Sequence, residues 1–107
     1  MRLLLVCSEN RLRSPTAAAI FEAYDGVEAI GAGTNADADT PASGDLIQWA
    51  DAILVMEESH RSKISTKFKP LISGKKLAVM GIPDKFKYMQ PELVSLLKKR
   101  VPKYVAL

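Results

Sequence analysis

The sequence predicts an α/β fold: one three-layer domain over residues 1–107, with a four-stranded parallel sheet and helices on both faces. Short apolar runs typical of buried strands alternate four times with segments typical of helices, which is the pattern of βαβ units. The length of 107 residues fits one compact domain, and 48% apolar with 25% charged side chains is typical of a globular protein. The apolar runs are too short to span a bilayer, so no membrane is predicted as a partner.

The first strand and the first helix have clear signals. Residues 2–6 form a mainly apolar run, which is typical of a strand buried on both faces of a parallel sheet. Ser14 and Pro15 form a helix start signal, because proline suits the first helical position and serine caps well before it. A helix is therefore predicted over residues 15–24, and a weaker strand over residues 27–32.

The middle of the chain continues the alternation. Residues 33–42 are rich in glycine, asparagine, aspartate, threonine and proline, which predicts a loop. A short helix follows over residues 43–49, with a serine in the capping position. Residues 51–56 form the third predicted strand, and residues 58–68 have the pattern of a helix.

The last part of the chain supplies one more strand and one more helix. The strand is predicted over residues 76–80 and the loop after it over residues 81–90. Pro91 opens an amphipathic helix that Pro102 ends. Since ligands of parallel sheets bind beyond the C-terminal ends of the strands, residues 7–14, 57–60 and 81–88 are predicted to meet at one edge.

Charge is distributed unevenly along the sequence. Residues 1–60 carry 3 basic and 10 acidic side chains, whereas residues 61–107 carry 12 basic and 2 acidic ones. A basic half can serve a phosphate-rich partner, but the lysines are scattered and no aromatic side chains are interleaved in a nucleic-acid motif. We therefore interpret the basic half as a solvated surface and predict no nucleic-acid partner.

The chain contains one cysteine and one histidine. A structural zinc site takes four such ligands, and an internal disulfide takes two cysteines, so the sequence predicts no metal, no other cofactor and a reducing, cytoplasmic location. His60, the only histidine, is predicted to lie on the surface at a helix start.

The most informative segment follows the first strand. Cys7 stands directly after that strand, five residues separate it from Arg13, and a helix then begins. A loop between a strand and a helix N-terminus points backbone N–H groups inward and makes an anion site. Arg13 is suited to binding two oxygens of a phosphate, and the same positive field favours the reactive thiolate of Cys7. Ser14 is predicted to donate a hydrogen bond to the Cys7 sulfur.

These residues resemble the phosphate-binding loop of the low-molecular-weight protein tyrosine phosphatases, and in particular a short bacterial branch of that family. The pattern is C-x5-R-S-P, spanning Cys7–Pro15, with Asn10 at the family's asparagine position. Three further segments resemble the family in the same order along the chain. They are Gly31–Thr34, Asp51–His60 and the acid-bearing segment Pro83–Phe86.

The resemblance implies a two-step hydrolysis of a phosphate ester. The Cys7 thiolate attacks phosphorus and forms a cysteinyl-phosphate, while Arg13 and the loop amides hold the other oxygens. The predicted phosphate-binding residues are Ser8, Glu9, Asn10, Arg11, Leu12 and Arg13. Asp84 then serves as general acid and afterwards as general base. It is also the only carboxylate between Glu58 and Glu92, so it is the only candidate on its loop.

The substrate is predicted to be a phosphorylated protein, with phosphotyrosine first, or a small phosphomonoester, and free phosphate or sulfate would occupy the same loop. Phe86 and Tyr88 follow the acid on the same predicted loop, where they are expected to flank a flat aromatic leaving group.

Two other functions remain open at this point. The first is a cysteine-phosphorylated phosphocarrier like the IIB domains of sugar phosphotransferase systems, which also place a cysteine after their first strand. The second is a non-catalytic module that binds phosphate or a phosphoprotein. Arsenate reduction on the same scaffold is disfavoured, because it needs resolving cysteines and only Cys7 is present.

Overall fold

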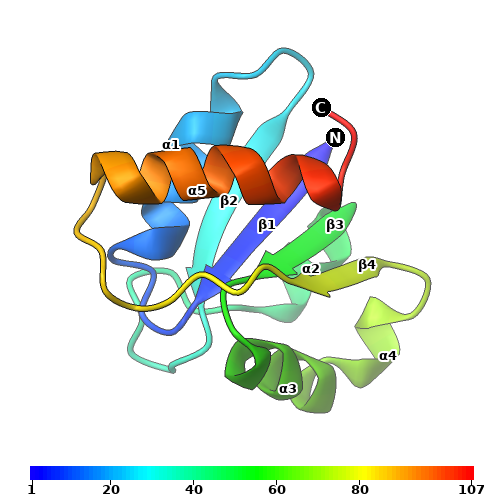
Figure 1. Ribbon diagram of the computed structural model, residues 1–107. Helices are drawn as coiled ribbons and strands as arrows, with labels where there is room; N and C mark the ends of the chain where they lie inside the picture. Colours follow the sequence, from blue (N-terminus) through cyan, green and yellow to red (C-terminus); the bar gives the residue numbers. More distant parts are fainter.

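A computed structural model describes residues 1–107 and shows a four-stranded sheet in the order β2-β1-β3-β4, with every pairing parallel (Figure 1). The strands are β1 (Arg2–Cys7), β2 (Glu28–Gly33), β3 (Ala52–Val55) and β4 (Lys76–Val79). The predicted α/β class and four-stranded parallel sheet are confirmed.

Helices cover both faces of this sheet. They are α1 (Arg13–Glu22), α2 (Gly44–Trp49), α3 (Glu58–Lys67), α4 (Lys69–Ile72) and α5 (Pro91–Arg100), followed by the 3-10 turn η1 (Val101–Lys103). Buried side chains of α1 and α5 share one hydrophobic cluster, whereas those of α2 and α3 belong to a second cluster. The domain therefore has three layers, as predicted (Figure 1).

The central strand β1 explains why the core has two halves. Leu3 and Leu5 belong to the cluster under α1 and α5, and Leu4 and Val6 belong to the cluster on the opposite face. All four side chains are fully buried. Successive side chains of a strand point to opposite faces, so a strand covered on both sides must be apolar throughout.

Several helix boundaries differ from the prediction by one or two residues. Helix α1 begins at Arg13 rather than at Pro15, and Ser14 lies inside its first turn instead of capping it. The helix over 58–68 ends one residue early, because Phe68 leaves the helical conformation with a φ of −119° and Pro70 lies in the first turn of the short helix α4. No helix of the chain combines the length and the apolar composition needed to cross a bilayer.

Candidate active site

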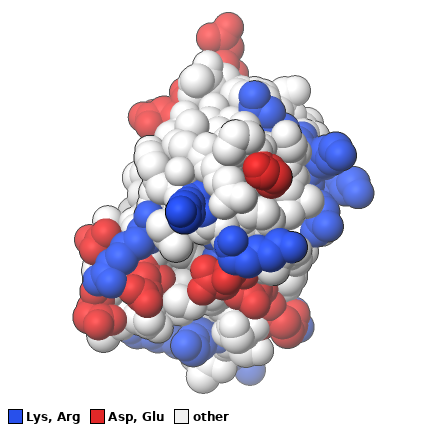
Figure 2. Space-filling view, turned by 60° about the vertical axis from the view of Figure 1, so that its left-hand side comes forward, with Lys and Arg blue, Asp and Glu red and all other residues white.

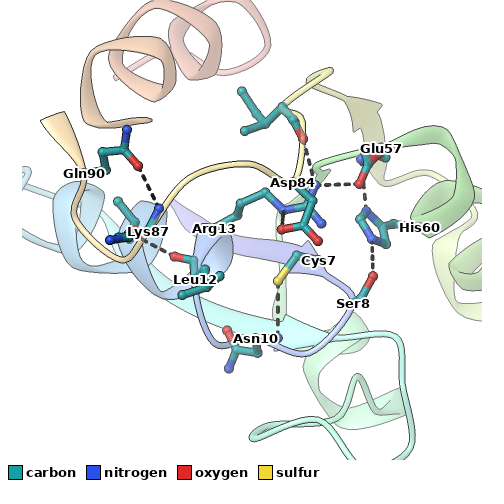
Figure 3. Close-up of polar contacts among 12 residues, drawn as sticks. Cys7, Ser8, Asn10, Leu12, Arg13, Glu57, His60, Asp84, Lys87 and Gln90 are labelled. Atoms are coloured by element: carbon teal, nitrogen blue, oxygen red, sulfur yellow. Dashed lines mark hydrogen bonds and ion pairs between the residues drawn. The ribbon is translucent and has the colours of Figure 1, made fainter. Parts of the chain in front are cut away.

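The loop between β1 and α1 forms the floor of a pocket at the C-terminal edge of the sheet (Figure 3). The pocket has a volume of about 210 Å³. Its lining consists of Cys7, Ser8, Glu9, Arg11, Leu12, Arg13 and Asp84. The structure thus brings six residues of the segment 7–13 together with the predicted acid, although more than half of the chain separates them. Asn10 is the one residue of that segment that does not line the pocket.

The Cys7 sulfur lies at the floor of the pocket. The backbone N–H of Asn10 points at it from 3.2 Å. Asn10 adopts a positive φ of 55°, a conformation that asparagine tolerates better than most residues and that turns its N–H toward the sulfur. The expected bond from Ser14 is absent: the Ser14 hydroxyl is buried and has no hydrogen-bond partner. This prediction was wrong because Ser14 lies in the first turn of α1, not before it.

The guanidinium of Arg13 is fixed by three oxygen atoms. The side chain is 3% exposed, and its Nη1 donates to Glu57 Oε2 at 2.6 Å and to the carbonyl of Ile82 at 2.8 Å. Its Nε lies 3.7 Å from Asp84 Oδ1. A buried charge needs partners of this kind, and here they also orient the guanidinium at the pocket wall before any anion binds.

Asp84 projects over the same pocket from the loop between β4 and α5. Its side chain is 65% exposed, so the carboxylate can exchange protons with solvent. Figure 3 shows Asp84 above the Cys7 sulfur and beside Arg13. A cysteine sulfur, a guanidinium and a carboxylate therefore converge on one small cavity. Phosphoryl transfer through a covalent intermediate requires groups of these three types.

No protein-family model matches the chain, and no curated protein matches its sequence. Several solved structures match its fold. The YwlE arginine phosphatase from Geobacillus stearothermophilus is 22% identical, with a TM-score of 0.72 over 95% of this chain and 91% of that one.

Two tyrosine phosphatases match similarly. Wzb from Escherichia coli K30, in complex with phosphate, is 22% identical, with a TM-score of 0.75 over 96% of this chain and 94% of that one. A low-molecular-weight protein tyrosine phosphatase from Bacillus subtilis is 23% identical, with a TM-score of 0.66 over 96% and 98%. The chain has the low-molecular-weight phosphatase fold. The fold that the sequence resemblance implied is thereby confirmed.

Within this phosphatase fold, His60 is a buried residue and not a surface residue as predicted. It is 1% exposed. The N–H of Glu57 donates to His60 Nδ1 at 3.0 Å, so the ring hydrogen lies on Nε2, which is 2.9 Å from Ser8 Oγ. His60 therefore links the start of α3 to Ser8 (Figure 3). Ser8 belongs to the predicted phosphate-binding segment Cys7–Leu12 before α1, which we call the phosphate loop. The sequence signal for this contact was the spacing of three residues between Glu57 and His60 at a helix start, which is the spacing of a capping box.

The pKa of His60 gives a testable pH dependence. Burial lowers the pKa from 6.5 to about 4, and the positive charge of Arg13 adds to this effect. Because the unfolded chain binds a proton on this ring at a higher pH than the folded chain does, stability decreases as the pH falls from about 6.5 to about 4. We expect a loss of about 3 kcal/mol in the free energy of unfolding across this window.

Urea unfolding at several pH values, with native protein and His60→Gln, measures this contribution. The variant should lose the part of the pH dependence that belongs to the ring, while the carboxylates titrate alike in both proteins. Identical pH profiles for the two proteins would contradict the prediction.

The loop over residues 34–39 braces the phosphate loop from outside. The N–H groups of Thr34, Asn35 and Asp39 donate to the carbonyls of Cys7, Ser8 and Glu9 at 2.9, 3.0 and 3.0 Å. With these carbonyls held outward, the phosphate loop keeps amides available to the pocket, as in other anion-binding nests. The sequence analysis identified a turn-rich loop here but not its contact with the phosphate loop.

Gly33 allows these hydrogen bonds to form, because its backbone lies close to the phosphate loop. A Cβ atom at this position would lie 2.5 Å from the carbonyl oxygen of Ser8 and 2.5 Å from the Cβ of Ala38. We expect Gly33→Ala to lower the free energy of unfolding by about 1–3 kcal/mol, as overpacking does, and to weaken phosphate binding.

Urea unfolding and phosphate titration measure the two effects of Gly33→Ala. Gly44→Ala is the matched control, since its added carbon meets only the tip of Leu71 at 3.3 Å. Equal effects of the two substitutions would contradict the proposed role of the close approach.

Glu9 is held at the pocket rim by an ion pair. Arg11 Nη1 lies 2.6 Å from Glu9 Oε2, and Arg11 Nε lies 3.3 Å from Asp39 Oδ1. The hydrogen bond that Arg11 donates to Asp39 and the negative charge of Glu9 raise the pKa of Arg11. The Glu9 carboxylate therefore has a cationic partner at the rim.

The wider face around the pocket carries mixed charge. Figure 2 turns the left-hand side of Figure 1 forward, where the loop after β1 and the loop before α5 lie, and shows Lys or Arg interspersed with Asp or Glu in its lower half.

The two predicted aromatic substrate contacts lie elsewhere. Phe86 is 9% exposed and belongs to the hydrophobic core under α1 and α5, so it is not free to flank a ligand. Tyr88 is 53% exposed but does not line the pocket. The Phe86 prediction failed because its loop runs along the core before it reaches α5. The structure also shows no group of three His, Cys, Asp or Glu side chains that is placed to hold a metal ion.

Proposed function

We propose that the protein is a cysteine-dependent phosphomonoesterase, with phosphotyrosine in proteins as the first substrate class. The observation that carries this proposal is the shared pocket of Cys7, Arg13 and Asp84. Two of the similar structures are named tyrosine phosphatases, and one of them is in complex with phosphate. The sole cysteine works only in its reduced state, so we place the protein in the cytoplasm.

In the first step, the Cys7 thiolate attacks phosphorus in line with the ester oxygen. The S–P bond forms and the P–O bond of the ester breaks. The leaving oxygen takes a proton from the Asp84 carboxyl group. Arg13 and the N–H groups of residues 8–12 stabilise the charge on the other three oxygens, and because they are fixed in advance they need little rearrangement.

In the second step, water replaces the sulfur. Asp84, now a carboxylate, takes a proton from the attacking water, the new P–O bond forms, and the S–P bond breaks. Inorganic phosphate leaves and the Cys7 thiolate is restored. The exposed position of Asp84 suits both roles, because the leaving group and the water must arrive from the open side of the pocket.

The position of Asp84 also favours a hydrolase over a phosphocarrier. A carrier must protect its phosphocysteine until an acceptor arrives, whereas this chain places a proton-accepting carboxylate at the mouth of the pocket. A pure binding module would need no reactive sulfur beneath the anion site.

A second candidate substrate is phosphoarginine. One similar structure is named an arginine phosphatase. The pocket lining contains two carboxylates and no aromatic side chain, and the nearby Phe86 is buried. Carboxylates suit a leaving group that departs as a guanidinium, whereas an aromatic leaving group gains from aromatic neighbours.

The rates of hydrolysis of two peptides that differ only in the phosphorylated residue distinguish phosphotyrosine from phosphoarginine as the substrate. We would measure kcat/KM for a phosphotyrosine peptide and for a phosphoarginine peptide of otherwise identical sequence, with EDTA present. Turnover of either supports a phosphatase and names its substrate. A phosphoenzyme that persists for minutes without turnover supports a carrier, and phosphate binding with neither result supports a binding module.

A further inference from the structure

Four consecutive carbonyls lead into the loop that carries Asp84, and each accepts a hydrogen bond from a side chain. The Tyr104 hydroxyl donates to Val79 O at 3.0 Å. Arg100 Nη1 donates to Met80 O and to Gly81 O, the latter at 3.3 Å. Arg13 Nη1 donates to Ile82 O at 2.8 Å. One donor, Arg13, is the first residue of α1, and the other two lie in the C-terminal part of the chain.

The N–H groups of the same segment bond to the end of β3. Met80 N–H donates to Val55 O, and Ile82 N–H donates to Met56 O, both at 2.9 Å. Because β4 is an edge strand, no further strand covers its outer side. Arg100 and Tyr104 supply donors to this segment from the C-terminal part of the chain.

Gly81 adapts the backbone to this contact. It has a φ of 71°, which glycine adopts without strain, and a Cβ atom there would lie 3.2 Å from Arg100 Nη1. Glycine at position 81 therefore permits both the turn of the backbone and the close approach of the Arg100 guanidinium.

Beyond Ile82 the loop has few anchors. The backbone groups of residues 83–86 make no hydrogen bonds, and the next fixed point is the buried ring of Phe86. The position of the Asp84 carboxylate above the sulfur thus depends on how the segment Val79–Ile82 is held.

We propose that Arg100 is a positioning residue for proton transfer: by holding Met80 and Gly81, it sets where Asp84 stands above Cys7. This inference rests on the proposed hydrolysis. Arg100 is half-buried at the end of α5, whereas the side chains of its neighbours Lys98 and Lys99 are exposed and make no hydrogen bond or ion pair. Only Arg100 of this basic run reaches the segment before Asp84.

Leaving-group dependence tests this role. We would compare Arg100→Met, which keeps an apolar stem, with Arg100→Lys, which keeps the charge, and use Lys99→Met as the matched control. The readout is kcat/KM for phenyl phosphate, a poor leaving group, and for p-nitrophenyl phosphate, a good one. Misplacement of an acid costs rate mainly when the leaving group needs its proton. We expect Arg100→Met to lose about tenfold on phenyl phosphate and about twofold or less on p-nitrophenyl phosphate.

Arg100→Lys should recover part of the loss, and Lys99→Met should match the native protein. In an Asp84→Asn background, Arg100→Met should cause no further selective loss on phenyl phosphate. Equal losses on both substrates, or none, would overturn the proposal, because a merely structural role gives no leaving-group selectivity.

A second measurement does not need activity. Hydrogen exchange at the amides of Met80 and Ile82 should be faster in Arg100→Met and unchanged in Lys99→Met, and unchanged exchange in Arg100→Met would overturn the proposal. If the native protein hydrolyses neither ester, the proposed function fails, and the exchange data still decide whether Arg100 holds this segment.

Discussion

Replacing Cys7 by serine is expected to lower kcat for p-nitrophenyl phosphate on the order of 10⁵-fold, the scale seen when a covalent nucleophile is removed. A serine hydroxyl is far less nucleophilic than a thiolate. The only histidine of the chain, which could otherwise act as a base for it, makes its contacts with Ser8 and Glu57. Initial rates with EDTA present measure the effect.

The same variant should still bind inorganic phosphate, because the loop amides and Arg13 remain in place. Phosphate titration by calorimetry is therefore the control for an intact site. Substantial hydrolysis by Cys7→Ser would remove the sulfur from its proposed role, and loss of both hydrolysis and phosphate binding would indicate a collapsed loop instead.

The second large effect is expected at Asp84. We expect Asp84→Asn to lower kcat/KM for phenyl phosphate by about 10²–10³-fold, and for p-nitrophenyl phosphate by only a few-fold, since general acid catalysis contributes on this scale when the leaving group is basic. Asparagine keeps the size of the side chain but has no proton to transfer and none to accept.

A matched control for Asp84→Asn is Asp37→Asn, which removes an exposed carboxylate from the loop beside the site without touching the pocket lining. It should leave both rates unchanged. A similar loss on both substrates in Asp84→Asn would indicate that the carboxylate orients Arg13 rather than transferring a proton.

The sequence predicted the sheet and the position of the loop between β1 and α1 well, because both signals are local. The apolar run of β1 and the spacing of Cys7 and Arg13 each lie within a few residues, so periodicity and chemistry could be interpreted directly. Their convergence with Asp84 followed from one topological rule, that parallel strands bring their C-terminal ends to the same edge.

The sequence did not predict contacts whose partners are distant in the chain. Ser14 is a residue type that often caps a helix N-terminus, yet α1 starts before it and its hydroxyl is buried. Phe86 lies two residues after Asp84, where a substrate contact was predicted, yet its ring packs in the hydrophobic core. The bonds of Arg100 depend on a glycine nineteen residues earlier. Each outcome was set by packing geometry, which residue type and local spacing do not specify.

The single thiol of this protein allows its chains to be counted by a chemical titration. Cys7 is the only cysteine of the chain, and it lies on the floor of the pocket. A thiol titration of the unfolded protein therefore counts chains, and the same titration of the folded protein counts accessible sites. Peroxide damage is then visible as missing thiol, because no second cysteine of the chain can capture the oxidised sulfur as a disulfide.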